Sequence, residues 1–201
     1  AAMVLMALDH VRDFFSGAAV DPLDLVHAST ALFLTRWITH FCAPVFVCLA
    51  GVSVRLSLER RRSVRDVAWF LLTRGAWLVV LELTVVRLGW SFDVSYRVVV
   101  GQVIWAIGWS MIVLAGLVWL PLGAIAAVAI SLIAGHNLFD GVRVTGGGVA
   151  TAAWAILHTG DALPLSESRV FMPVYPLLPW PGVMAIGYVI GAGLARGQRA
   201  R

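Results

Sequence analysis

The sequence predicts an all-α membrane protein: a polytopic transmembrane helical bundle that forms a single domain over residues 1–201. Two features of the composition indicate this, because 60% of the residues are hydrophobic and only 13% are charged. Soluble domains carry about 25% charged residues. The third observation is that arginines cluster at the ends of apolar runs that are long enough to cross a bilayer. The net charge of +4 therefore indicates membrane orientation and not nucleic-acid binding.

The apolar runs give about six spans. The chain opens inside an apolar run that ends near Phe15, so we expect a clipped first helix and hence a fragment of a longer protein. The second span is expected at residues 31–56, and the basic run at 59–66 that follows it should be cytoplasmic, since positive charge collects on that side. The remaining spans are expected at 67–90, 98–120, 122–137 and 175–194.

The segment 146–158 is expected not to cross the membrane. It has about 13 residues, and a spanning helix needs about 20. The last span ends in Arg196, Arg199 and Arg201, which should be cytoplasmic, so this span must begin on the outer side. The span before the segment, 122–137, is also expected to end on the outer side, so the segment must return to the side from which it starts. We therefore expect a re-entrant or interfacial element.

Ionisable residues inside the first two apolar runs are the strongest functional signal. Arg36 and His40 are four residues apart, which places them on one face of a helix. Asp9 and His10 lie in the preceding run. Because ionisable groups are costly at membrane depth, they usually face the bundle interior and mark a functional site. We predict that the two segments build one polar site, although a histidine in a span can also be a simple interhelical hydrogen-bond partner.

Further polar residues fall in the outer half of the other spans. Glu82 could line the same site, or could form a structural ion pair with Arg87 or Arg36. Asn137 closes its span and could equally cap the helix. Arg74 is the exception, because it lies near the cytoplasmic end, where an arginine can also extend to the interface. The cysteines and histidines have no metal-ligand spacing, so no metal is expected.

The carboxylates around His10 indicate acid–base chemistry. Asp9 and Asp13 flank His10 and would raise its basicity. A histidine with a pKa near neutrality, held by a carboxylate, suits general-base work on a hydroxyl or an amine.

Blocks of sequence along nearly the whole chain resemble a known family. Residues 2–15, 35–46, 74–78, 135–137 and 175–184, in this order, resemble bacterial membrane proteins related to heparan-α-glucosaminide N-acetyltransferase, within the transmembrane acyltransferases. The resemblance implies an integral protein of the bacterial inner membrane. It would move an acetyl or acyl group from cytoplasmic acetyl-CoA to a sugar amine or hydroxyl, on a saccharide or glycolipid, at the extracytoplasmic side.

The resemblance also suggests residue roles. His10 would be the general base or a transient acyl carrier, oriented by Asp9 or Asp13. In the animal enzyme the histidine lies in the following loop, for which His27 is the candidate, so the catalytic histidine stays open. His40 and Arg36 would hold the acceptor or stabilise the oxyanion, and Arg74 would bind a phosphate of CoA. The expected pocket residues are Glu82, Gln102, Trp105, Trp109, Asn137 and Trp180.

Two other classes of function remain open. A transporter or flippase without covalent chemistry would use the same polar groups, since these also mark substrate pathways. A structural or regulatory membrane protein is the third class. The expected partners are membrane lipids and the acceptor, with no nucleic acid.

Overall fold

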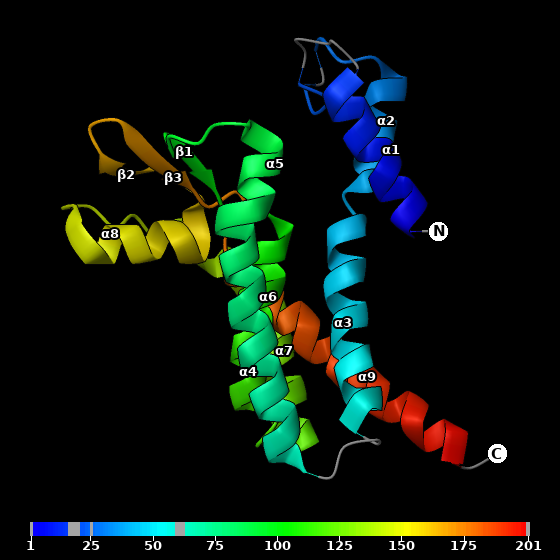
Figure 1. The fold of residues 1–201 in the computed structure, drawn as a ribbon. Coiled ribbons are helices and arrows are strands. Elements are labelled where there is room, and N and C mark those ends of the chain that lie inside the picture. The colour runs from blue at the N-terminus through cyan, green and yellow to red at the C-terminus, as the bar shows by residue number, and fades with distance from the viewer. Residues whose placement is uncertain (1, 16–20, 25, 59–62, 200–201) are drawn as a thin grey trace. The chain divides into compact units, whose positions relative to one another are not determined.

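The computed structural model describes residues 2–15, 21–24, 26–58 and 63–199, most of which are helical (Figure 1). The chain divides into two compact units, Ala1–Val47 and Cys48–Arg201, and each is described by itself. Residues 59–62 of the predicted basic loop lie outside the described residues.

The first unit contains α1 (Ala2–Phe15), α2 (Thr30–Thr39) and the beginning of α3 (Cys42–Leu58). The side chain of Ser29 caps α2 by accepting a hydrogen bond from the backbone N–H of Leu32 at 3.2 Å. A turn at residues 40–41 separates α2 from α3, where the sequence predicted an uninterrupted span. Pro44 explains the turn, because it has no N–H to donate to the carbonyl of His40 and its ring conflicts with that carbonyl.

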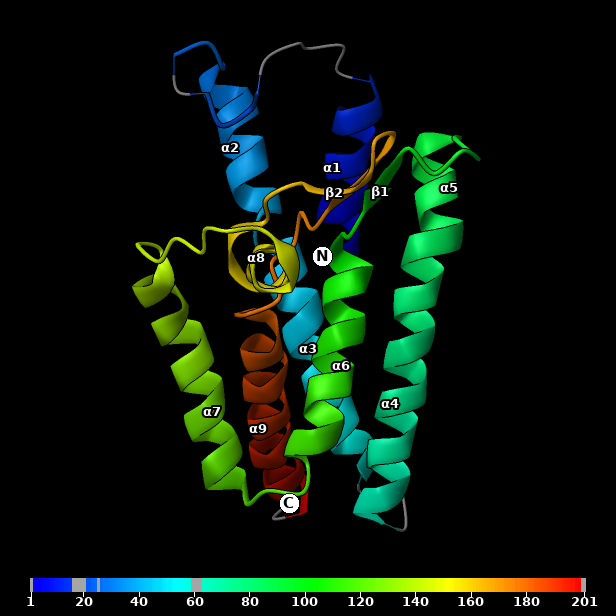
Figure 2. The same ribbon diagram turned by 90° about the vertical axis from the view of Figure 1, so that its left-hand side faces the viewer.

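The second unit is built on four long helices. They are α4 (Val64–Leu81), α6 (Val103–Leu117), α7 (Leu122–Gly135) and α9 (Trp180–Arg199). Helix α4 lies beside α6, α6 beside α9, and α9 beside α7 (Figure 2). A π-turn, η1 (Glu82–Val86), and a short helix, α5 (Arg87–Ser91), extend α4, while a 3-10 turn, η2 (His136–Phe139), extends α7.

Glycines allow the backbones of these helices to approach closely. A Cβ atom added to Gly75 of α4 would lie 2.6 Å from the carbonyl oxygen of Gly108 in α6. A Cβ on Gly51, in the second half of α3, would overlap the carbonyl oxygen of Met184 in α9. Small residues at helix crossings are typical of membrane bundles, in which packing rather than the hydrophobic effect holds helices together.

Helix α8 (Gly148–Trp154) continues into a π-turn, η3 (Ala155–Thr159), and lies across the long helices. In Figure 1 it lies to the left of α4 and roughly perpendicular to it, and in Figure 2 it is seen end-on. The seven residues of α8 and the five of η3 are too few to span a bilayer. The observed length agrees with the prediction that this segment does not cross, and its position on the outer side stays a prediction.

A small sheet is the feature that the sequence did not predict. Strands β1 (Val98–Val100), β2 (Leu163–Ser166) and β3 (Arg169–Met172) pair in the order β1-β3-β2. Strand β1 is parallel to β3 and β2 is antiparallel to it. The prediction of a span over 98–120 was therefore wrong at its start, because β1 leads into a helix that begins only at Val103. Hydropathy alone does not separate a short valine run in a strand from the same run in a buried helix.

Three helical stretches among the described residues are long and apolar enough to cross a membrane: Thr30–Leu58, Val64–Ser91 and Leu122–Phe139. Helix Val103–Leu117 is apolar but shorter. The protein is thus a mostly helical integral membrane protein with a small sheet. Three of the expected spans are supported by length and composition, and the other three stay a prediction.

Candidate functional site

The carboxylate of Asp9 is the centre of a polar cluster in the first unit. It lies 2.6 Å from the Nη2 atom of Arg12 and 3.1 Å from the Nη1 atom of Arg36. The hydroxyl of Thr39 donates a hydrogen bond to the same carboxylate at 2.7 Å. The side chain of Asp9 is only 15% exposed. We call these four residues the Asp9 cluster.

Helical spacing explains how the cluster forms. Asp9 and Arg12 are three residues apart on α1, and Arg36 and Thr39 are three residues apart on α2, so each pair lies on one helix face. The two faces meet where the helices pack. Charges that are removed from water need partners, and Asp9 supplies one for both arginines. Two guanidinium groups and one carboxylate leave the cluster with a formal charge of +1.

His40 is held against its own helix through one ring nitrogen. Its Nδ1 atom lies 3.0 Å from the carbonyl oxygen of Arg36. A carbonyl oxygen only accepts hydrogen bonds, so Nδ1 carries the hydrogen and the lone pair of the neutral ring is on Nε2. The side chain is exposed, so a hydroxyl or an amine can reach that nitrogen. This is the tautomer that a general base at Nε2 requires.

The other expected members of this site are placed less closely. His10 is half-buried, next to Asp9 in the chain, while the recorded contacts of the Asp9 carboxylate are those with Arg12, Arg36 and Thr39. Asp9 thus holds two arginines, and its expected role in orienting His10 stays a prediction. The side chain of Asp13 lies outside the described part of the structure.

A cavity of about 490 Å³ adjoins the Asp9 cluster. Side chains of α1 and α2, among them Leu8 and Ile38, form its apolar walls, and Asp9, Arg12 and Thr39 lie on its polar side. The volume is typical of sites that bind small molecules. An amphipathic ligand would fit these walls.

His27, the alternative catalytic histidine, lies in the exposed loop between α1 and α2. Its Nδ1 atom is 2.6 Å from the carboxylate of Asp24. This hydrogen bond, together with one from the backbone N–H of Val26, lowers the pKa of Asp24 below its ordinary value. The recorded partner of His27 is therefore a loop carboxylate and not a member of the Asp9 cluster.

The second unit holds a separate buried carboxylate, Glu82, which is 1% exposed. Its Oε2 atom accepts a hydrogen bond from the backbone N–H of Trp105 at 3.2 Å. Trp105 is in the first turn of α6, where backbone N–H groups have no partner within the helix. A carboxylate at this end of a helix is also stabilised by the helix dipole. Half-buried Gln102 is the N-cap residue of α6, so the structure brings Glu82, Gln102 and Trp105 together as expected.

The possible ion pair between Glu82 and Arg87 is not among the recorded contacts of Arg87. The Nε atom of Arg87 donates to the carbonyl oxygen of Val98 at 3.0 Å, and its Nη2 atom lies 3.3 Å from Asp93. Its guanidinium carbon is 3.9 Å from the ring centroid of Tyr96. Arg87 is 3% exposed. Sequence analysis missed this cluster, although an aspartate six residues after an arginine at the end of a span was a usable signal.

Asp93 is the anchor of the loop after α5. The pKa of its carboxyl is lowered to about 2, because it accepts hydrogen bonds from the hydroxyl and the backbone N–H of Ser95 and lies near Arg87. The carboxylate thereby ties Arg87 to the loop that leads into β1.

Three expected site residues lie elsewhere in the second unit. Asn137 is exposed on η2. Trp180 begins α9, and its ring centroid is 5.2 Å from that of Tyr175. Arg74 is exposed on α4, with its guanidinium carbon 5.6 Å from the ring centroid of Phe70. Among the described residues, no recorded contact joins these three to Glu82.

Helices long and apolar enough to cross a membrane, together with buried ionisable clusters, define an integral membrane protein. The whole chain, residues 1–201, matches the family model described as heparan-alpha-glucosaminide N-acetyltransferase, catalytic. The chain belongs to this family, as the resemblance predicted. No curated protein and no solved structure matches the chain.

Proposed function

We propose that the protein is an integral membrane acetyltransferase that moves an acetyl group from cytoplasmic acetyl-CoA to an amine or hydroxyl of a saccharide or glycolipid at the extracytoplasmic side. Family membership over the whole chain supports the class of reaction. The observation that carries the proposal is the Asp9 cluster, where a carboxylate holds two guanidinium groups next to two histidines in a chain with membrane-spanning helices.

A histidine of the first unit removes a proton from the acceptor. His40 suits this step because its Nδ1 atom contacts the Arg36 carbonyl, which leaves Nε2 as the basic nitrogen of the neutral ring, with no recorded partner among the described residues; His10 is the alternative beside Asp9. The acceptor nitrogen or oxygen forms a bond to the acetyl carbon, the carbon–sulfur bond of the thioester breaks, and CoA leaves as its thiol. The imidazole takes the proton from the acceptor, and the resulting imidazolium donates it to the departing sulfur.

Arg36 stabilises the charge that develops on the acetyl oxygen. A guanidinium held in place before the reaction costs little reorganisation when negative charge appears. The ion pair with Asp9 and the contact between Asp9 and Thr39 fix this position. Asp13 stays a candidate for orienting His10.

The donor is proposed to bind on the cytoplasmic side. Acetyl-CoA supplies an activated acetyl thioester, and its phosphates need cationic partners. Arg74 fits this need, because its side chain is exposed on α4 and a guanidinium pairs well with phosphate. The acceptor pocket is proposed to include Glu82, Gln102, Trp105, Trp109, Asn137 and Trp180.

The proposal is tested with purified protein in proteoliposomes, radiolabelled acetyl-CoA and a panel of amino sugars and glycolipids. Label should pass to at least one acceptor. His40→Ala or His10→Ala should reduce the rate by about 10²–10⁴-fold, the usual contribution of a general base. His136→Ala is the matched control, since its Nδ1 atom also lies close to a backbone carbonyl, that of Ile133 at 2.7 Å.

Three results would contradict the proposal. Saccharide uptake without acetyl transfer would identify a transporter or flippase. Failure of the protein to bind CoA would exclude acetyl-CoA as the acetyl donor. Equal activity in the His10, His40 and His136 variants would show that neither histidine is the base.

A further inference from the structure

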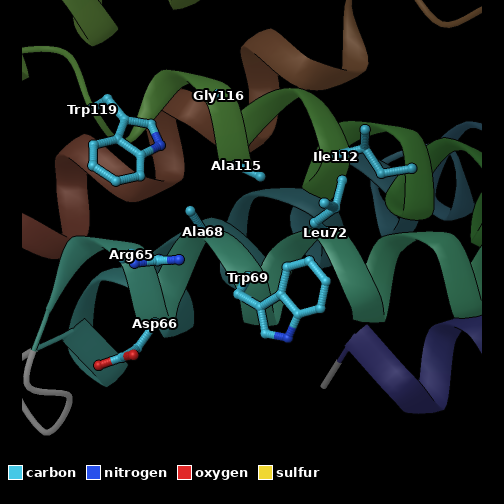
Figure 3. Close-up of a pocket in the computed structure, with 9 residues that line it drawn as sticks. All are labelled: Arg65, Asp66, Ala68, Trp69, Leu72, Ile112, Ala115, Gly116 and Trp119. Atoms are coloured by element: carbon cyan, nitrogen blue, oxygen red, sulfur yellow. The ribbon is translucent and has the colours of Figure 1, made fainter.

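A groove between α4 and α6 lies apart from the residues discussed above (Figure 3). The backbones of the two helices touch at Gly75 and Gly108, and a Cβ on Gly75 would lie 2.6 Å from the Gly108 carbonyl oxygen. Toward the start of α4 and the end of α6 they leave a groove of about 620 Å³. The groove therefore follows from one close crossing near the middle of both helices.

Small residues form the floor of the groove and two tryptophans stand at its sides. Ala68 of α4 and Ala115 and Gly116 of α6 face the space. Trp69 and Trp119 line it and are 66% and 61% exposed. Exposed tryptophans at the ends of membrane-spanning helices are typical of the zone between lipid headgroups and acyl chains.

One end of the groove carries a guanidinium group. Arg65 and Asp66, both in the first turn of α4, line this end, and in Figure 3 the side chain of Arg65 extends toward the groove while the carboxylate of Asp66 points away from it. From Arg65 to Leu72 the helix rises by about 10 Å, at roughly 1.5 Å per residue. Beyond Arg65 and Asp66 the lining is apolar, with Leu72 and Ile112 at the far end. A ligand for this groove needs an anionic head and an apolar chain.

We propose that the groove binds one acyl chain of an anionic phospholipid, with the phosphate group paired to Arg65. The guanidinium of Arg65 at one end, an apolar floor that leads away from it, and exposed tryptophans at its sides all fit this ligand. The volume also suits a small ligand, since binding sites for small molecules measure about 300–1,000 Å³. The inference is independent of the acetyl-transfer reaction.

The test measures lipid retained by the purified protein after exchange into micelles that contain equal amounts of phosphatidylglycerol and phosphatidylcholine, by native mass spectrometry. The wild-type protein should retain one phosphatidylglycerol in preference. Arg65→Gln should retain a lipid but lose about five-fold of this preference, the contribution of one arginine near an anionic lipid. Arg169→Gln, at an arginine on the β2–β3 hairpin, is the charge control.

A second variant tests the groove itself. Nothing lies within 4 Å of a Cβ added to Gly116, so Gly116→Leu should fold and fill the groove, and bound lipid should fall to background. Gly123→Leu on α7 is the matched control, because a Cβ there also meets open space. Melting temperatures of both variants show that folding is kept.

Each contrary result overturns a stated part of the inference. Unchanged retention in Gly116→Leu would show that the lipid binds elsewhere. An unchanged preference for phosphatidylglycerol in Arg65→Gln would show that Arg65 does not contact the lipid phosphate. A cysteine at Gly116 that cross-links to another part of the protein would show that protein covers the groove.

Discussion

The side chains of Asp9 in α1 and Arg36 in α2 meet at 3.1 Å, although the residues are 27 positions apart in the chain. The same carboxylate also binds Arg12 and Thr39. One acidic group therefore determines how two cationic side chains are presented next to His40. This makes Asp9 the residue whose loss should have the widest consequences in the first unit.

We expect Asp9→Asn to lower both stability and acetyl transfer. The neutral amide keeps the shape of the side chain but removes the negative charge that the partly buried guanidinium groups of Arg12 and Arg36 contact. The free energy of unfolding should fall by about 1–3 kcal/mol, and the rate of acetyl transfer should fall by at least tenfold. Thermal melting in detergent and the radiolabel assay measure the two effects.

Asp21→Asn is the control for this change, because Asp21 is an exposed loop aspartate whose carboxylate accepts a hydrogen bond from the backbone N–H of Leu23. Asparagine can make the same bond, so neither quantity should change. A melting temperature and a rate in Asp9→Asn equal to those of Asp21→Asn would show that the Asp9 cluster has no structural or catalytic role.

The contact between Asp9 and Arg36 shows what sequence could predict here. Ionisable residues in apolar runs are rare enough that their presence alone indicated a shared polar site. Which side chains contact the Asp9 carboxylate was harder to predict from the sequence. No pattern in the sequence indicated that the Asp9 carboxylate contacts Arg12, Arg36 and Thr39, and its expected role in orienting His10 stays a prediction.

The second unit shows where hydropathy fails. The valines at 98–100 are as apolar as a helical span, yet they pair with β3, and the choice depends on a strand about 70 residues later. Glu82 was expected in a pocket, and it also caps α6 through the N–H of Trp105. Both outcomes depend on long-range pairing, which local periodicity does not encode.

The orientation of the second unit can be tested with single cysteines in a Cys42→Ala, Cys48→Ala background. A cysteine at Ser63, before α4, should be shielded from an impermeant thiol reagent added outside intact cells. A cysteine at Val94, which is 80% exposed in the loop after α5, should react. The expectation rests on the positive-inside rule. Labelling at Ser63 together with protection at Val94 would invert the orientation.

Acid should loosen the loop that Asp93 anchors. The pKa of Asp93 is lowered to about 2 in the folded protein, through the hydrogen bonds from Ser95 and the nearby Arg87. A carboxyl whose folded pKa is depressed stabilises the protein above its unfolded pKa of 3.8, and this contribution is lost as the pH falls toward 2. Melting temperatures measured from pH 6 to pH 2.5 should fall, and part of this decrease should be absent in Asp93→Asn.

Asp161→Asn provides the comparison for Asp93, since Asp161 is an exposed loop aspartate that accepts a hydrogen bond from Thr159. If Asp93→Asn and Asp161→Asn lose stability in acid to the same extent as the wild-type protein, the contacts of Asp93 do not support the fold.

The crossing of α4 and α6 predicts opposite effects for two identical substitutions. Gly75→Ala places a methyl group 2.6 Å from the Gly108 carbonyl oxygen, so the backbones must separate. The cost of overpacking is about 1–3 kcal/mol. Gly89→Ala in α5 meets no atom within 4 Å and should instead stabilise the helix, since alanine is favoured over glycine by about 1 kcal/mol. Thermal melting of the two variants in the same detergent compares them directly. A higher melting temperature in both would mean that the two helices do not touch at Gly75, and the groove between them would lose its structural cause.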